Sequence, residues 1–353
     1  MEKTNEKIAI IGGGSSGMAT AAYFTRIGFP VILCDTPEHT EDYDAIQKQQ
    51  GILLRGGSGQ SGCAMPELTR DFSRAMQADR VLLCVPHNRH EEISALCAPL
   101  ARPGQVFLFC PGNFGSFGLR RRLDALGKKD TLVGDLSGNL WACRRTAPGE
   151  VIVADSLKVA RVAALPAADT PALIEALADF LPAKAGKNVM EVSLNSPNVI
   201  SHLAGAVLNG TLVEKMGENF AFFRDGLGQT AITCFSALEQ ERSTLFAALG
   251  FDVYSPPSEG LMRRLLDKSC REMDIFRNLD GPSSFAHRYV SEDAACGVAM
   301  LVGLGQAAQV PMPLTRAFLT ICSTINHTDY EKTGRTPKNL GLPDTLPELL
   351  ACL

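Results

Sequence analysis

Short apolar runs alternate with longer stretches of helical spacing from the start of the chain to Asn195. The runs predict strands at 7–11, 31–35, 80–85, 105–110 and 131–134, and a closing hairpin of 150–155 with 158–165. Helical spacing predicts helices at 16–27 and 170–180. Strands that are apolar throughout and alternate with helices are typical of a parallel sheet covered on both faces. This part therefore predicts an α/β domain with a parallel-sheet core.

Beyond Asn195 the strand-like runs stop and helical spacing takes over. Helices are predicted at 229–249, 258–270, 293–309 and 313–326. We therefore expect a mostly α-helical second domain. Two domains suit a chain of 353 residues, and we place them at 1–190 and 191–353.

Composition excludes several classes of protein. The chain has 34 basic and 38 acidic side chains, so it carries no basic surplus for nucleic acid. Its 11 cysteines are odd in number and form no C-x-x-C pair, which favours reduced thiols and a cytoplasmic protein. The polar start at 1–6 is no secretory signal, and the uncharged segment 294–315 is interrupted by glutamine, glycine and proline. No membrane role is expected.

A glycine cluster follows the first predicted strand and opens the first predicted helix. Residues 12–17 read Gly-Gly-Gly-Ser-Ser-Gly and match G-x-G-x-x-G. Gly12 would permit the tight turn, Gly14 the approach of a diphosphate, and Gly17 the packing of helix on strand. Ser15 and Ser16 would lie at the helix N-terminus, which favours an anion. The context predicts a Rossmann-type dinucleotide-binding domain, although a purely structural glycine turn is the alternative.

Asp35 ends the second predicted strand, 18 residues after Gly17. A carboxylate at this place accepts hydrogen bonds from the adenine-ribose hydroxyls and repels a 2′-phosphate. The following residues 36–38 include no arginine or lysine, so NADH is expected, with NADPH left open. The alternative is that Asp35 only caps the next turn. The later strand ends at Val85-Pro86 and Pro111 belong to the same ligand-binding edge and are further candidates.

His87 and His90, with Glu91 and Glu92, are the nearest approach to a metal-binding cluster. They lack the further histidine or cysteine ligands that a zinc site needs. We expect no metal, and we place these residues at the exposed start of a helix.

Three polar segments interrupt the helical half, at 195–202, 287–293 and 334–342. Taken by residue type alone, each has a structural explanation. His202 could be a buried structural histidine, Glu292 and Asp293 an acidic pair at a helix N-terminus, and Arg335 an anchor for the tail.

The order and spacing of these segments resemble the octopine/nopaline dehydrogenases, or opine dehydrogenases, over nearly the whole chain. The matching features are the glycine loop, Cys143-Arg144-Arg145, Asn198 with His202, Arg288-Tyr289 with Glu292-Asp293, Pro311 with Pro313, and Gly334-Arg335 before Leu340-Gly341-Leu342. The resemblance implies a Rossmann-type domain followed by a helical catalytic domain. It also implies that an amino acid condenses with a 2-oxo acid such as pyruvate, and that NAD(P)H reduces the resulting imine.

By position, the resemblance makes His202 the catalytic histidine, Asp293 its partner and Arg288 the residue on the oxo-acid carboxylate. It adds Asn198 and Arg335 as substrate-binding residues. Leu203 stands where relatives commonly have proline, and 294–296 also departs from the family. These departures put the identity of the amino acid in doubt, and neither the oxo acid nor a homodimer is settled by sequence.

Two other functions remain open at this point. One is a ketopantoate-reductase-like enzyme that reduces a 2-oxo acid without any amine. The other is a dinucleotide sensor without catalysis. Turnover that requires an amine would separate the main hypothesis from both.

Overall fold

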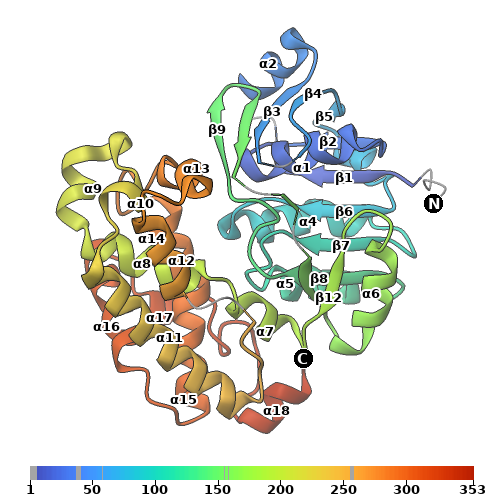
Figure 1. Ribbon diagram of the computed structural model, residues 1–353. Helices are drawn as coiled ribbons and strands as arrows, with labels where there is room; N and C mark the ends of the chain where they lie inside the picture. The colour runs from blue at the N-terminus through green and yellow to red at the C-terminus, as the bar shows by residue number, and fades with distance from the viewer. Residues whose placement is uncertain (1–5, 37–40, 58, 155, 158, 255–257) are drawn as a thin grey trace. The chain divides into compact units, whose positions relative to one another are not determined.

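The computed structural model describes residues 6–36, 41–57, 59–154, 156–157, 159–254 and 258–353. The chain divides into two compact units, Met1–Val192 and Ser193–Leu353. Figure 1 shows strands and helices together in the first and helices in the second. Each unit is described by itself below.

The first unit is built on an eight-stranded sheet with the order β12-β11-β8-β7-β6-β1-β2-β5. Its strands are β1 (Ile8–Ile11), β2 (Val31–Cys34), β5 (Glu67–Thr69), β6 (Arg80–Leu83), β7 (Val106–Phe109), β8 (Leu132–Leu136), β11 (Ala160–Ala164) and β12 (Ala183–Ala185). Neighbours from β8 to β5 are parallel, and β11 pairs antiparallel with β8. The predicted parallel-sheet core is confirmed. Since the chain leaves β1 for β2 on one side and later returns to β6 on the other, the order reverses at β1, where such sheets bind ligands.

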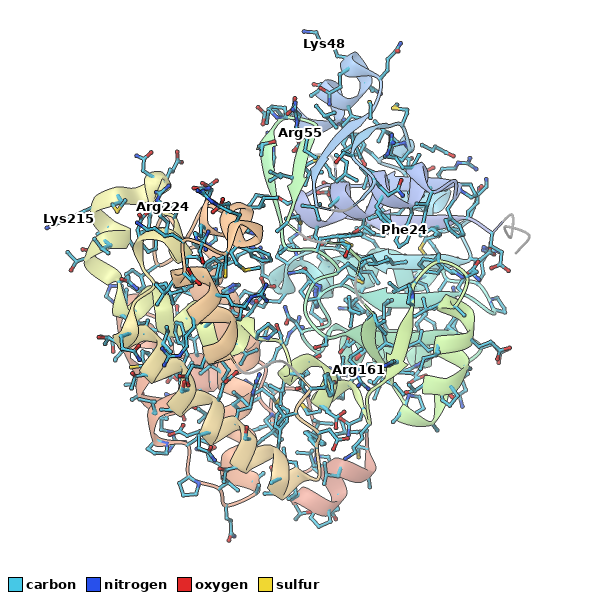
Figure 2. All side chains as sticks on the ribbon, viewed as in Figure 1. Phe24, Lys48, Arg55, Arg161, Lys215 and Arg224 are labelled. Carbon is cyan, nitrogen blue, oxygen red and sulfur yellow. The ribbon has the colours of Figure 1, made fainter. Side chains whose placement is uncertain are left out.

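Helices cover both faces of this sheet. Ile8 and Ile10 of β1 join one core cluster with α1 (Ser15–Arg26) and α6 (Thr170–Leu177). Ala9 and Ile11 join the other with α3 (Phe72–Ala75), α4 (His90–Leu100) and α5 (Gly115–Ala125). Burial on both faces explains why the strands are apolar without alternation. Phe24 of α1 lies inside this unit, whereas Lys48 extends from its edge (Figure 2).

The predicted hairpin of 150–155 with 158–165 is wrong, and Asp155 and Lys158 lie outside the described residues. β10 (Glu150–Val153) pairs with β9 (Cys143–Ala147) and with β3 (Ile52–Gly56) in a separate sheet, ordered β4-β3-β10-β9. β4 (Gly62–Ala64) completes that sheet, and α2 (Glu41–Gln49) precedes β3. The segment 36–79, expected as a connection, thus supplies strands to both sheets. An apolar run identifies a strand but does not specify its partner.

The second unit is helical, and its described residues form no strand. Its main helices are α8 (Asn198–Leu208), α9 (Gly210–Met216), α10 (Phe222–Asp225), α11 (Gln229–Leu249), α12 (Ser258–Leu266), α13 (Asp274–Arg277), α14 (Arg288–Asp293), α15 (Ala299–Ala307), α16 (Pro313–Ile325), α17 (Tyr330–Thr333) and α18 (Leu346–Ala351). α7 (Val189–Leu194) spans the division between the units. α8 packs against α14, α11 and α16. Within the described ranges, no helix has the length and apolar character of a membrane span.

The helix predicted at 293–309 begins earlier, at Arg288, and contains a π-helical turn, η5 (Ala294–Val298). His287 caps its start, because the Tyr289 N–H donates to His287 Nδ1 at 3.3 Å. Glu292 and Asp293 therefore end α14. The alternative that they form an acidic pair at a helix N-terminus is wrong.

Candidate active site

The glycine loop between β1 and α1 is closely packed at two positions and open at a third. Gly12 has φ +110°, and a Cβ there would lie 2.5 Å from the Cys84 carbonyl oxygen. A Cβ at Gly17 would lie 1.7 Å from the Gly12 carbonyl oxygen, whereas one at Gly14 would have no atom within 4 Å. Side chains are thus excluded at Gly12 and Gly17 by the fold, and the backbone at Gly14 is accessible to a ligand.

The N-terminus of α1 has the features of an anion site. Gly14 is the N-cap residue of the helix, so no side-chain hydrogen bond caps the first turn. Ser16 Oγ is buried and has no hydrogen-bond partner among the residues described. Ser15 Oγ accepts the Arg145 N–H at 3.0 Å, which ties β9 to the loop. Free first-turn N–H groups and an unpaired hydroxyl fit the diphosphate of a dinucleotide.

Asp35 joins the end of β2 to the glycine loop. The Gly13 N–H donates to its Oδ2 and the Thr36 N–H to its Oδ1, both at 2.8 Å. The carboxylate thus bonds the backbone of the glycine loop and of the next residue, and its contact with a ribose hydroxyl stays a prediction. Arg89, from η1 (His87–Arg89), donates to Thr36 Oγ1 at 3.3 Å. Sequence reasoning missed this cation beside Asp35, because 53 residues separate it from Thr36.

Val85, Pro86 and Pro111 follow β6 and β7 at the edge of the sheet that also carries Gly12. A Cβ at Gly12 would lie 2.8 Å from Val85 Cγ1, so Val85 adjoins the loop. Pro86 is exposed, and Pro111 follows Cys110 through a cis peptide bond. Their contact with a cofactor stays a prediction.

His90 does not lie at an exposed helix start, so that expectation is wrong. It is 1% exposed, its ring centre is 4.8 Å from that of Phe109, and its Nε2 is 3.2 Å from the Val85 carbonyl oxygen. Phe109 lies in the buried strand β7, and the His90 ring packs against it inside the unit. No group of metal ligands was found in the described part of the chain.

In the helical unit, α8 and α14 bring His202 and Asp293 together. His202 Nδ1 lies 2.9 Å from Asp293 Oδ2, and the two side chains are only 10% and 14% exposed. A carboxylate on Nδ1 selects the tautomer of the imidazole and stabilises its charged form. The pair has the geometry of a general acid–base dyad.

A buried arginine holds the segment that leads into α8. Arg242 of α11 is 1% exposed and donates to the carbonyl oxygens of Leu194 and Ser196, at 3.2 and 3.3 Å. Burial lowers the pKa of this guanidinium, and nearby Glu239 raises it. These two hydrogen bonds fix the chain just before Asn198, which begins α8 one helical turn ahead of His202.

Arg288 begins α14 and is directed by an acidic residue on the same helix. Its Nη1 lies 3.7 Å from Glu292 Oε2, and the Glu292 side chain is 8% exposed against 44% for Arg288. Sequence reasoning treated Glu292 only as a member of an acidic pair. A spacing of four residues brings the two side chains together only because α14 begins at Arg288, earlier than the helix predicted at 293–309.

Arg335 follows α17 and contacts η5, the helical turn that begins directly after Asp293. Its N–H donates to the Ala295 carbonyl oxygen of η5 at 2.6 Å, and a Cβ at Gly334 would lie 2.7 Å from that oxygen. Burial raises the pKa of the Cys296 thiol on η5, the Arg335 guanidinium lowers it, and the Glu292 and Asp293 carboxylates raise it. A π-helical turn frees backbone carbonyls, and here one of them fixes Arg335.

A search of curated proteins found an opine dehydrogenase from Arthrobacter sp. (strain 1C) that is 31% identical over 345 residues, covering 95% of this chain and 94% of the relative. The chain belongs to the opine dehydrogenase family. Residues 185–326 match the family model "NAD/NADP octopine/nopaline dehydrogenase, alpha-helical domain". The family expected from the sequence is confirmed, and so is the class of enzyme, an NAD(P)-dependent oxidoreductase acting on CH–NH groups.

Solved opine dehydrogenases share the fold of this family member. An octopine dehydrogenase in complex with NADH and pyruvate has a TM-score of 0.72 at 20% identity, over 98% of each chain. A yersinopine dehydrogenase with NADP+ bound has a TM-score of 0.67 at 16% identity, over 100% of this chain and 98% of that one. These similarities confirm the expected α/β domain followed by a helical domain.

Proposed function

We propose that this opine dehydrogenase uses His202 and Asp293 as the acid–base pair for an NADH-dependent condensation of an amino acid with a 2-oxo acid. The observation that carries the proposal is the 2.9 Å contact between His202 Nδ1 and Asp293 Oδ2, on side chains that are almost wholly buried. Pyruvate is the first oxo acid to test, because octopine dehydrogenase is solved with it.

The condensation needs proton transfers at one oxygen atom. The amine adds to the carbonyl carbon of the oxo acid, and the oxygen must then leave as water to give the imine. Because Nδ1 is engaged by Asp293, His202 acts through Nε2: it takes the two protons that the amine nitrogen loses, one at a time, and passes each to that oxygen. Asp293 stabilises the imidazolium that forms between the two transfers.

The guanidinium of Arg288 holds the oxo-acid carboxylate through two parallel hydrogen bonds. Asn198 and Arg335 complete the substrate-binding set. When bound, the reduced nicotinamide would supply a hydride to the imine carbon, and the imine nitrogen would take up one proton to give the secondary amine. Gly14 and Ser16 would hold the diphosphate at the N-terminus of α1, while Gly12 and Gly17 allow the loop to pack closely there. A cytoplasmic location belongs to the same proposal, since none of the eleven cysteines, all of which lie in the described ranges, forms a disulfide.

The amine requirement tests this function. NADH absorbance is followed with pyruvate, oxaloacetate or 2-oxoglutarate, each with and without a panel of amino acids. The expected result is oxidation only when both substrates are present, with the secondary amine dicarboxylate found by mass spectrometry. Equal oxidation with an oxo acid alone would instead establish a ketopantoate-reductase-like activity. NADH binding without turnover across the panel would establish a sensor.

Asp35 should set the preference for NADH. Replacing it with alanine removes the acceptor for the ribose hydroxyls and the repulsion of a 2′-phosphate, while Arg89 stays nearby. We expect the ratio of kcat/KM for NADH to that for NADPH to fall by about tenfold or more. This change corresponds to the free energy of roughly one charge-assisted hydrogen bond. The matched control is Asp71→Ala, since Asp71 caps α3 and should leave the ratio unchanged. A wild-type enzyme that prefers NADPH would refute the assignment.

A further inference from the structure

The flat face of the His202 imidazole is covered by an aromatic ring. The Tyr289 ring centre lies 3.7 Å from that of His202, and the two planes differ by 9°. Tyr289 is 3% exposed, so the two rings form a buried parallel stack. The acid–base proposal assigns nothing to this side chain.

The stack follows from the register of α14. Tyr289 and Asp293 are four residues apart, so both face α8. The ring and the carboxylate therefore approach the same imidazole from one helix, Tyr289 on its face and Asp293 at its edge.

The Tyr289 ring is itself held in place. Phe222 meets it edge-on at 5.9 Å and 86°, and meets His202 at 6.3 Å and 78°. Gly205 of α8 makes this approach feasible, because a Cβ there would lie 2.2 Å from Phe222 Cζ. The His287 ring meets Tyr289 from another direction, at 5.0 Å and 73°. The stacked ring is thus a fixed surface.

We propose that Tyr289 is a positioning residue for the reaction, and that its ring fixes the plane of the His202 imidazole. This inference rests on the acid–base role proposed for His202. The hydrogen bond to Asp293 specifies the tautomer, but the χ2 torsion of histidine is broad and is not specified by one bond. A ring stacked on the imidazole face prevents tilting, so the two contacts together determine where Nε2 points. The electron-rich face also favours the imidazolium that acid catalysis needs.

The test compares Tyr289→Leu with Tyr289→Phe. Leucine removes the aromatic surface, so we expect kcat to fall by about 10–100-fold, the scale of a misplacement near 1 Å. KM for both substrates should change by less than about threefold, because neither substrate loses a binding group. Phenylalanine preserves the stack and should restore kcat to within about threefold of wild type. Phe318→Leu, a matched loss of a buried ring on α16, should lower thermal stability and leave kcat unchanged.

Three results would overturn the inference. One is a Tyr289→Leu enzyme with wild-type kcat. Another is a Tyr289→Phe enzyme as impaired as Tyr289→Leu, which would assign the role to the hydroxyl. The third is a Tyr289→Leu enzyme in which only KM for the oxo acid rises. That result would mean that Tyr289 positions Arg288, whose Cζ lies 5.8 Å from the ring centre, and not His202. Failure of the function itself is distinguishable, because His202→Ala would then be active.

Discussion

Replacing His202 with alanine should lower kcat for the reductive condensation by about 10²–10⁴, the usual contribution of a general acid–base. The departing oxygen then has no positioned proton donor, and Asp293, which is 14% exposed, loses its imidazole partner. KM for the two substrates and the affinity for NADH should change little, because the imidazole acts chiefly in the transition state. Steady-state kinetics with both substrates varied, and NADH binding by fluorescence, measure the two effects separately.

The matched control for this variant is His327→Ala. His327 lies in the same unit, is exposed and follows α16. Its replacement should leave kcat at the wild-type value. Near wild-type turnover in His202→Ala, with unchanged product, would remove His202 from the mechanism and leave the family reaction intact.

The glycine loop could be predicted from sequence because its pattern is contained in the six consecutive residues 12–17. Gly17 adjoins the Gly12 carbonyl oxygen within the loop. Gly12 adjoins the Cys84 carbonyl oxygen at the end of the neighbouring strand β6, so only glycine fits at both positions. The parallel core was predictable for a related reason. Strands such as β1, buried on both faces, are apolar at every position.

The partner of β10 could not be predicted in this way. Its apolar residues indicate that it pairs with another strand but do not specify which one. Its parallel partner β3 lies about a hundred residues earlier in the chain. β3 itself was missed because polar residues surround it. The second sheet and its contacts with the glycine loop through Arg145 therefore emerge only in the folded chain.

The helical site also combines features that the sequence predicts with features that only the folded chain shows. Its residue types and their order identified the family, so His202, Asp293 and Arg288 could be named beforehand. The prediction did not include the Tyr289 stack or the Arg288–Glu292 pair, because both depend on α14 starting at Arg288. The start is set by a cap from His287, a histidine at a position where serine, threonine, aspartate or asparagine is the usual signal.

Replacing Arg288 with alanine should raise KM for the oxo acid and lower kcat/KM by about 10²-fold. Loss of one partner from a hydrogen-bonded charge pair costs about 2–5 kcal/mol when the pair is desolvated. We expect the lower end of that range, because the Arg288 side chain is 44% exposed and water screens part of the interaction. Each 1.4 kcal/mol corresponds to tenfold in kcat/KM, so a loss of about 2.8 kcal/mol, in the lower half of that range, gives the stated hundredfold.

Arg288→Lys separates charge from shape. Lysine retains the positive charge but cannot present two parallel donors to a planar carboxylate. It should therefore recover only part of the lost kcat/KM, about tenfold of the hundredfold. Arg316→Ala is the matched control, since Arg316 is 45% exposed and pairs with Glu331 at 3.2 Å in the same unit. That variant should leave both KM values at the wild-type level.

The two KM values decide which substrate Arg288 binds. Each of the condensing molecules carries a carboxylate, so both are candidates for the guanidinium. If Arg288 binds the oxo acid, KM for the amino acid stays unchanged in Arg288→Ala, and larger 2-oxo acids lose as much kcat/KM as pyruvate. If KM for the amino acid rises instead, Arg288 binds the amino-acid carboxylate. Arg335, which η5 fixes through the Ala295 carbonyl, then becomes the cation for the oxo acid.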